Sequence, residues 1–459
     1  MANEKTNVDP LASANGNEPP AADGAFLRPA ARSLQLFSQG DAGTGAGGAN
    51  RTKNAEPTAM TAFTDQPYTL RCAGYECTDQ GVRTANGKTV CLHPIMPAGS
   101  ITDMETGIVS LIVAFRTQNY WEEKAYPRTL LANASSILAL AGAGIAVTTE
   151  NARALSAYLT NLYHRNDDIL PIKFSMSRLG WATPRSDTFA PYDETVLTDA
   201  EGVFLEKRNA VRPCGNEETW LAAVKPLWLQ NRTARLVLDA AFGSVLLTPL
   251  ELQPFFVHIW GQTGLGKTVL LQLAASVWGD PAPGRLITTF HSTATGLELN
   301  AAFLHDLPML IDELQIVSAG GKNDFQQTVY ALAEGVGKTR GNKDGGLRKQ
   351  FTWRNIMITT GERPLGTDLS GGGALNRAVE LELTEPITRD FAGLVNTISV
   401  NHGVAGYRFL QVVVKRRNIL KQLWLEYSAE LLTLGATGKQ AAAMAVLMLA
   451  DSLLAMTLF

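Results

Sequence analysis

The pattern of hydrophobic and polar residues in the second half of the chain predicts a layered α/β domain. Short apolar runs bounded by turn residues are typical of strands buried in a parallel sheet, and they occur at 254–260, 307–314 and 351–361. A further short strand is expected at 378–383. Between them, apolar residues recur at helical spacing, as in 269–278 and 324–334. Because strands alternate with helices, we expect a parallel sheet covered by helices over residues 251–390.

The residues before this domain predict a smaller α+β domain at 66–210. We expect its strands, separated by Gly, Asp and Asn turns, at 68–72, 89–92, 109–115, 180–181 and 189–192. Its helices are expected near 128–140, ending at the Gly142-Ala-Gly144 turn, and from Thr149 onward. Two further helices, at 217–229 and 233–246, are predicted to form a bridge at 211–250 that leads to the parallel sheet.

The two ends of the chain have different compositions. Residues 1–65 are rich in Ala, Gly, Asn, Pro and Thr with few large apolar side chains, which predicts a disordered arm. Residues 391–459 are predicted to be helical, and the apolar run 441–459 is long enough to suggest a membrane span. Because Asp451 lies inside this run, we favour a packed helix and expect no membrane association.

Charge and cysteine content limit the functional classes. The net charge of −3 and the pI of about 6.1 provide no overall basic field, so contact with nucleic acid requires a local patch. Four cysteines are present, and their spacing favours reduced thiols over a zinc site formed by Cys72, Cys77, Cys91 and His93. Few cysteines and a polar N-terminus lacking a signal-peptide pattern predict a cytoplasmic protein.

A glycine-rich loop carries the strongest chemical signal. Residues 261–268, Gly-Gln-Thr-Gly-Leu-Gly-Lys-Thr, match the Gly-x-x-x-x-Gly-Lys-Ser/Thr pattern between a predicted strand and a predicted helix. Gly261, Gly264 and Gly266 allow backbone amides to surround phosphates, and the helix N-terminus favours their charge. Lys267 is expected to reach the β- and γ-phosphates, and Thr268 to hold Mg²⁺. A glycine-rich turn without function is the alternative.

Acidic residues follow the next buried strand, about 45 residues after the loop. Asp312 is predicted to hold the water shell of Mg²⁺, and Glu313 to polarise the attacking water as general base. The strand at 351–361 ends in Thr359 and Thr360, one of which is expected to orient that water. Exposed acidic or hydroxyl strand ends without function are the alternatives.

A basic, glycine-rich segment at 335–349 predicts a flexible hairpin between these two strands. Five cations stand in it: Lys338, Arg340, Lys343, Arg348 and Lys349. Contact with the DNA backbone is favoured, with a solvated loop or a second nucleotide contact as alternatives. The Asn-Lys-x-Asp motif for guanine is absent because position 345 is Gly345, so ATP is favoured over GTP as the bound nucleotide.

These motifs together resemble the family called domain of unknown function 927. The resemblance rests on 259–281, 310–314, 335–340 and 358–362 and covers roughly 66–415. Members are P-loop ATPases of phages, plasmids and mobile islands, and many form the C-terminal part of primase–helicase proteins. The family is similar to AAA+ and superfamily 3 replicative helicases, which implies an AAA+/RecA-like P-loop ATPase core.

The resemblance also implies an assembly and a function. It implies a hexameric ring with ATP between subunits, in which Lys338 and Arg340 lie on or beside a hairpin facing a single DNA strand in a central channel. Arg377, in 374–381, matches the position of the arginine finger that acts on the neighbouring subunit. We therefore expect an ATP-hydrolysing DNA helicase of a phage or mobile element. The rivals are a non-helicase ATPase switch or protein remodeller, for example in phage defence, and a scaffold that uses nucleotide only for assembly.

Overall fold

The computed structural model describes residues 59–459 except 118, 194–195, 199–201, 290–292, 314–321, 340–349 and 366–375. Residues 1–58 of the predicted disordered arm (1–65) therefore lie outside the described residues. Its last residues, 59–65, are ordered, which corrects the predicted boundary. Phe63 is buried in the hydrophobic core of the following domain, and the Thr61 N–H donates to Leu70 O at 2.8 Å. One large apolar side chain is enough to anchor this short stretch.

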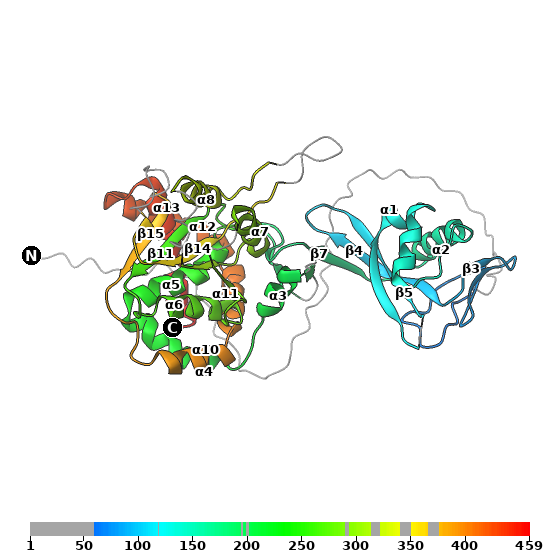
Figure 1. The fold of residues 1–459 in the computed structure, drawn as a ribbon, viewed down its shortest axis with the longest axis horizontal. Helices are drawn as coiled ribbons and strands as arrows, with labels where there is room; N and C mark the ends of the chain where they lie inside the picture. The colour runs from blue at the N-terminus through cyan, green and yellow to red at the C-terminus, as the bar shows by residue number, and fades with distance from the viewer. Residues whose placement is uncertain are drawn as a thin grey trace, which may run out of the picture. The chain divides into compact units, whose positions relative to one another are not determined.

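The N-terminal domain contains an antiparallel three-stranded sheet and a mixed five-stranded sheet (Figure 1). The first sheet consists of β1 (Tyr75–Thr78), β2 (Gly81–Thr84) and β3 (Thr89–Cys91). The second has the order β10-β7-β4-β5-β6, formed by β4 (Ile95–Asp103), β5 (Val109–Phe115), β6 (Glu122–Pro127), β7 (Ile172–Met176) and β10 (Val196–Thr198). Helices α1 (Arg128–Leu131) and α2 (Ala152–Arg165) pack on β5 and β4 and bury the core.

Two predictions for this domain are wrong. Residues 68–72 form no strand beyond an isolated bridge between Arg71 and Met60. The helix predicted at 128–140 is broken into α1 and the 3₁₀ helix η2 (Ser136–Ala143). Between them, Asn133 Oδ1 accepts from the Ser135 N–H at 2.9 Å, and Ser136 Oγ donates to Leu130 O at 2.8 Å. Such local side-chain bonds compete with the helical backbone pattern.

Residues 179–192 pack on the next domain, whereas β10 returns to pair with β7 of the N-terminal sheet. The predicted strand pair is confirmed as β8 (Gly180–Trp181) and β9 (Phe189–Ala190), which are antiparallel. Trp181 is fully buried and its indole Nε1 donates to Val245 O at 2.8 Å. The following helix α3 (Gly202–Ala210) places Lys207 Nζ 3.0 Å from Arg285 O. The boundary predicted at residue 210 therefore lies too late in the chain.

The second domain contains the predicted parallel sheet, with the order β12-β13-β14-β11-β15. Its strands are β11 (Phe255–Gly261), β12 (Ile287–Thr289), β13 (Met309–Asp312), β14 (Ile356–Gly361) and β15 (Ala378–Leu383). Each neighbouring pair is parallel, so all carboxyl ends meet at one edge. Because β14 lies between β11 and β13, the residues that follow these three strands become neighbours at that edge.

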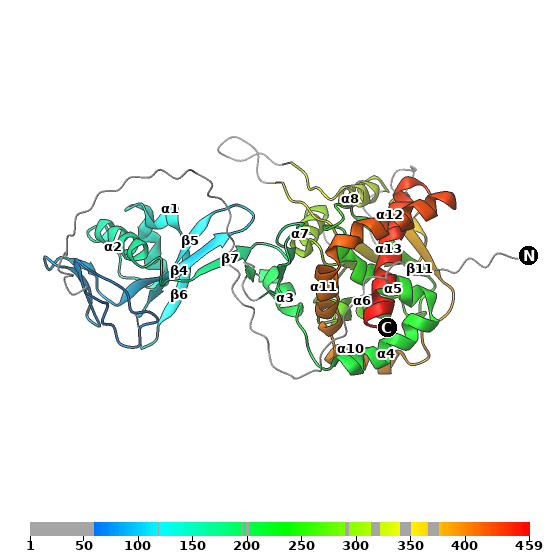
Figure 2. The ribbon, with the colours of Figure 1, turned by 180° about the vertical axis from the view of Figure 1, so that it is seen from behind.

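Helices surround this sheet (Figures 1 and 2). Those between residues 217 and 334 are α4 (Glu217–Gln230), α5 (Arg232–Gly243), α6 (Lys267–Trp278), α7 (Ala294–Leu304) and α8 (Lys322–Glu334), with the 3₁₀ helix η3 (Ser244–Leu246) after α5. Asn216 and Asn231 cap α4 and α5 by accepting from the Thr219 and Ala234 N–H groups. Both predicted bridging helices are confirmed, but α5 packs directly on β14 and α6 and so belongs to this domain.

The C-terminal residues are helical as predicted, in α10 (Phe391–Val400), α11 (Val404–Lys415), α12 (Arg417–Thr433) and α13 (Gly438–Thr457). Of the helices that the structure describes, only α13 is long and apolar enough to cross a membrane. It packs on α5 and α12, and half of its most apolar window is buried there. Asp451 accepts from Arg235 Nη2 of α5 at 2.8 Å, which satisfies the charge inside the apolar run. The predicted packing of this helix is therefore observed.

Candidate functional site

The glycine-rich loop joins the carboxyl end of β11 to the first turn of α6. Gly264 and Gly266 have φ values of 88° and 99°, a region that glycine adopts without strain. Gly266 is the N-cap of α6, so the helix begins at Lys267 with unpaired backbone N–H groups facing the loop. An arrangement of this kind, with the positive end of a helix dipole behind it, binds anions.

The two residues after Gly266 point in different directions. Lys267 Nζ donates to the carbonyl oxygens of Gly261 and Gln262 at 2.5 and 2.9 Å, so its ammonium group lies within the curve of the loop. Thr268 Oγ1 donates to Asp312 Oδ2 at 3.1 Å. The structure therefore brings together the loop lysine, the loop hydroxyl and the predicted acidic residue.

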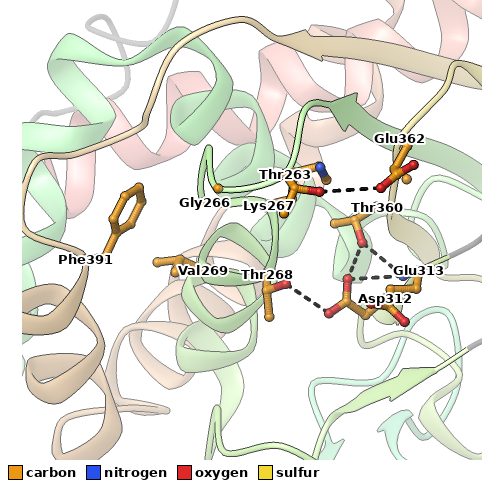
Figure 3. A pocket seen from close by; sticks show the side chains of 12 residues that line it. Thr263, Gly266, Lys267, Thr268, Val269, Asp312, Glu313, Thr360, Glu362 and Phe391 are labelled. Carbon is orange, nitrogen blue, oxygen red and sulfur yellow. Dashed lines mark hydrogen bonds between the residues drawn. The ribbon is translucent and has the colours of Figure 1, made fainter.

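Asp312 accepts from three donors at the carboxyl edge of the sheet (Figure 3). Besides Thr268, these are the Thr360 hydroxyl and the Glu313 N–H, which lies 3.1 Å from Asp312 Oδ1. Glu313 has a φ of 57° and directs its N–H also toward Thr360 Oγ1 at 3.2 Å. This left-handed backbone turns the chain sharply after β13 and leaves the Glu313 side chain exposed at the pocket.

Only one of the two predicted threonines faces this site. Ile311 of β13 pairs with Thr359, so the next residue along each strand, Asp312 and Thr360, are neighbours. Side chains alternate along a strand, and the Thr359 hydroxyl points the other way, 2.8 Å from His258 Nδ1. The second ring nitrogen of His258 lies 2.9 Å from Arg363 O, which fixes the turn after β14.

These groups line a pocket of about 590 Å³. It includes five residues that the sequence analysis did not assign to a site: Thr263, Val269, Gly361, Glu362 and Phe391. Glu362 follows β14 directly, as Glu313 follows β13, and that position was a signal for it in the sequence. Thr263 Oγ1 donates to Glu362 at 3.4 Å across the pocket. Phe391 lies beyond β15 at the start of α10, and no pattern in the sequence indicated it.

The donor groups fit a hard cation and not zinc. The described residues contain no group of three or more His, Cys, Asp or Glu side chains placed to hold a metal. Thr268 and Asp312 offer one hydroxyl and one carboxylate, the oxygen donors that Mg²⁺ takes together with phosphate and water.

The Cys72, Cys77, Cys91 and His93 group considered in the sequence has other partners. His93 Nε2 accepts from the Ala146 N–H at 2.9 Å, and Cys77 Sγ lies 3.7 Å from the Tyr158 hydroxyl. Burial lowers the pKa of His93 and raises the pKa of Cys91. A thiol whose pKa is raised ionises less readily and is a weaker metal ligand.

Arg377 lies at the opposite edge of the sheet from the glycine-rich loop. The Phe256 N–H, at the start of β11, donates to Arg377 O at 2.8 Å. A strand rises about 3.3 Å per residue, so β11 separates this edge from Gly261 by roughly 20 Å. The guanidinium Nη1 donates to Ala333 O at the end of α8, at 2.9 Å. The structure therefore does not bring Arg377 to the pocket of its own chain.

The basic segment is described only at its two flanks. Val336 and Thr352 form an antiparallel bridge, and the Gly337 N–H donates to Phe351 O at 2.8 Å. These contacts place the flanks side by side, as the base of a hairpin requires. Lys338 is exposed beside them. The other predicted DNA-binding residues, Arg340, Lys343, Arg348 and Lys349, lie outside the described residues.

Comparison with solved structures identifies a shared fold. The SCCmec type IV Cch structure, described as an active helicase, is similar with a TM-score of 0.62 and 18% identity, covering 84% of this chain and 74% of that chain. The apo C-terminal region of NrS-1 has a TM-score of 0.31 at 11% identity, covering 72% and 75%. JCV helicase bound to a small molecule has a TM-score of 0.26 at 12% identity, covering 49% and 67%. The last two scores are too low to carry an argument.

No curated protein matches the sequence. The model of a protein family does match it, over residues 69–352, which is more than half of the chain and extends from the N-terminal domain to the second flank of the basic segment. This range includes the glycine-rich loop and the Asp312–Glu313 strand end. The chain belongs to the family described as domain of unknown function (DUF927).

Proposed function

We propose that the chain is a nucleoside triphosphate-hydrolysing motor that moves on DNA, with ATP as substrate and Mg²⁺ as cofactor. The observation that carries the proposal is the cluster of Thr268, Asp312 and Thr360 beside a loop shaped for phosphate. Asp312 and Thr360 come from the neighbouring strands β13 and β14, and Thr268 comes from the start of α6, which follows β11. The cluster therefore depends on the parallel topology and not on one short motif.

The phosphate loop and its two polar side chains bind the triphosphate in this proposal. Backbone N–H groups of Gly264 and Gly266 and the start of α6 surround the phosphate oxygens. Lys267 exchanges its carbonyl partners for the β- and γ-phosphates. Thr268 and Asp312 would hold Mg²⁺, and the ion would supply positive charge to the phosphates.

Hydrolysis requires a water positioned in line with the γ-phosphorus. The Glu313 carboxylate accepts a proton from this water, whose oxygen bonds to the γ-phosphorus as the bond to the β,γ-bridging oxygen breaks. The products are ADP and inorganic phosphate. The Thr360 hydroxyl donates to the Asp312 carboxylate and keeps it oriented. In this proposal Thr360 also responds to the presence of the γ-phosphate.

The link to DNA runs through the chain between β13 and β14. This connection contains α8 and the basic segment, and it joins Glu313 to the strand that carries Thr360. In this proposal a change at Glu313 or Thr360 is transmitted to Lys338 through this connection. Lys338, Arg340, Lys343, Arg348 and Lys349 are proposed to contact phosphates of a single DNA strand. The fold that this chain shares with the SCCmec type IV Cch structure, described as an active helicase, supports the proposed contact with DNA.

We propose that the active unit is a ring of identical chains, and we expect six chains in the ring. Arg377 lies at the sheet edge away from its own pocket, so its proposed catalytic contact is with the nucleotide of a neighbouring subunit. Such a ring, acting in the cytoplasm, suits the replicative helicase of a phage or mobile element.

The test is strand separation on a short DNA duplex that carries a single-stranded tail. The full chain with ATP and Mg²⁺ is expected to release the labelled strand, and Lys267→Ala to release none. ATP hydrolysis without strand release, on tails of either polarity, would contradict the helicase and favour the protein-directed ATPase.

A further inference from the structure

We propose that the nucleobase stacks on the Phe391 ring, and that this contact recognises the flat face of the base and not its edge. The inference rests on the proposed nucleotide-binding function and extends it to base selectivity. It predicts that ATP and GTP bind with similar affinity, although the absence of a guanine motif in the sequence favoured ATP.

The direction of the triphosphate places the base at the Phe391 end of the pocket. The reacting γ-phosphate must lie near Asp312, Glu313 and Thr360, where the metal and water ligands are. The nucleoside then extends the other way. Figure 3 shows Gly266, Val269 and Thr268 between Phe391 and the carboxylates. When the phosphates occupy the loop, the base of the nucleotide is therefore expected to contact the Phe391 ring.

The Phe391 ring is held against the phosphate loop by its own segment. A Cβ placed on Gly266 would lie 2.5 Å from Cε1 of the ring, so the ring touches the bare backbone of the loop. The Ile387 N–H is directed at Leu265 O at 3.4 Å, and Asp390 caps α10 by accepting from the Gly393 N–H. The ring is half-buried and keeps one part of its surface toward the pocket.

The chemistry at this end of the pocket suits stacking. Figure 3 places Gly266 and Val269 beside Phe391 at this end of the pocket, and none of these three residues has a hydrogen-bonding side chain. The polar residues Thr388 and Asp390 of the same segment line a separate cavity with α4. Every base offers a π-face to an aromatic ring, so stacking alone distinguishes bases poorly. Rejection of one purine requires polar groups placed at the base edge.

The experiment compares ligands with and without a base. Binding of ATP, GTP and inorganic tripolyphosphate, each with Mg²⁺, is measured by calorimetry on the full chain. The variants are Phe391→Ala, Phe391→Trp, Lys267→Ala and, as a matched aromatic control, Tyr120→Ala, which removes an exposed ring of the N-terminal domain. Tripolyphosphate binding also reports whether each variant keeps a folded phosphate loop.

Phe391→Ala is expected to weaken ATP and GTP binding by about tenfold or more and to leave tripolyphosphate binding unchanged. Phe391→Trp is expected to restore both nucleotides, and Tyr120→Ala to change nothing. Equal loss of tripolyphosphate would mean that the ring only shapes the loop, and would overturn the proposal. So would unchanged ATP binding, or a preference of the wild type for one purine above about 100-fold. Failure of the wild type to bind ATP and tripolyphosphate alike would instead contradict the proposed function.

Discussion

Thr268 and Asp312 share a hydrogen bond of 3.1 Å between Oγ1 and Oδ2, which joins the first turn of α6 to the last residue of β13. The two residues come from different strand–helix units and meet only because β11 and β13 end at the same edge of the sheet. Thr360 of the intervening strand completes the contact by donating to the other carboxylate oxygen. The proposed metal position is therefore a consequence of strand order.

Replacing Asp312 with Asn tests the proposed metal position. The amide keeps the size of the side chain but loses the negative charge that holds Mg²⁺, so turnover should fall by about 100-fold or more. Steady-state ATP hydrolysis across a range of Mg²⁺ concentrations measures this effect. Asp280→Asn is the matched control, because Asp280 pairs with Arg285 outside the pocket. Equal activity of Asp312→Asn and the control would remove Asp312 from the mechanism.

Replacing Glu313 with Gln separates binding from chemistry. A general base contributes about 10²- to 10⁴-fold to a rate, so hydrolysis should drop by that factor while ATP affinity is retained. Single-turnover hydrolysis and ATP binding are the two measurements. Glu362→Gln is the informative comparison, since both carboxylates line the pocket. If Glu362→Gln abolishes hydrolysis and Glu313→Gln does not, the assignment of the base is wrong.

Arg377 is predicted to act on the neighbouring subunit. Arg377→Ala alone should reduce turnover by about 10³-fold, since an arginine finger contributes at least that much. Mixing Arg377→Ala with Lys267→Ala chains should restore part of the activity, because some mixed interfaces then pair an intact pocket with an intact arginine.

The mixing experiment also separates this role from a local one. Arg377 donates to Ala333 O, and loss of that bond alone would lower stability within each chain. In that case a mixture of the two inactive variants would stay inactive. A lowered unfolding temperature of Arg377→Ala without recovery on mixing would therefore contradict the trans role.

The buried Lys207 predicts a stability that depends on pH. Burial lowers the pKa of this lysine from 10.5 to about 8. Between these values the unfolded chain binds more protons than the folded chain, so the free energy of unfolding rises with pH, by up to about 3 kcal/mol. Below about pH 8 the buried charge costs this stability in full.

Lys207→Met should remove this rise. The stability gained by the variant over the wild type is expected to be largest below about pH 8 and to shrink toward pH 10.5. Urea unfolding at a series of pH values measures it, with Lys225→Met, at an exposed lysine of α4, as control. Parallel pH profiles for the wild type and Lys207→Met would show that Lys207 does not carry the dependence.

The parallel sheet was predictable because its central strands are buried on both faces. Such strands appear in the sequence as continuous apolar runs, and β11, β13 and β14 were found in this way. The mixed sheet of the N-terminal domain was harder to predict. Its edge strand β6 has the sequence Glu-Glu-Lys-Ala-Tyr-Pro, whose polar side chains resemble a loop. Only β5, which is apolar along most of its length, was predicted with its observed bounds.

Site residues that belong to a local sequence motif were predictable. Site residues whose position depends on strand pairing or on tertiary contacts were not. The choice between Thr359 and Thr360 depends on the register of β14 with β13, which no single segment encodes. Phe391 lies more than 120 residues after Gly266 in the chain and meets it only in the folded protein. The partner of Arg377 is likewise a backbone carbonyl of Ala333 on α8, which has no residue-type signal.

We propose that nucleotide hydrolysis is coupled to DNA through the connection between β13 and β14. ATP turnover measured with and without single-stranded DNA tests it most directly, on the wild type, Lys267→Ala and the double variant Lys338→Ala/Arg340→Ala. We predict that DNA stimulates ATP turnover by the wild type and that Lys267→Ala hydrolyses no ATP. The double variant is predicted to keep basal turnover but to lose the stimulation by DNA. Turnover that is robust and indifferent to DNA in both the wild type and the double variant would contradict the claim.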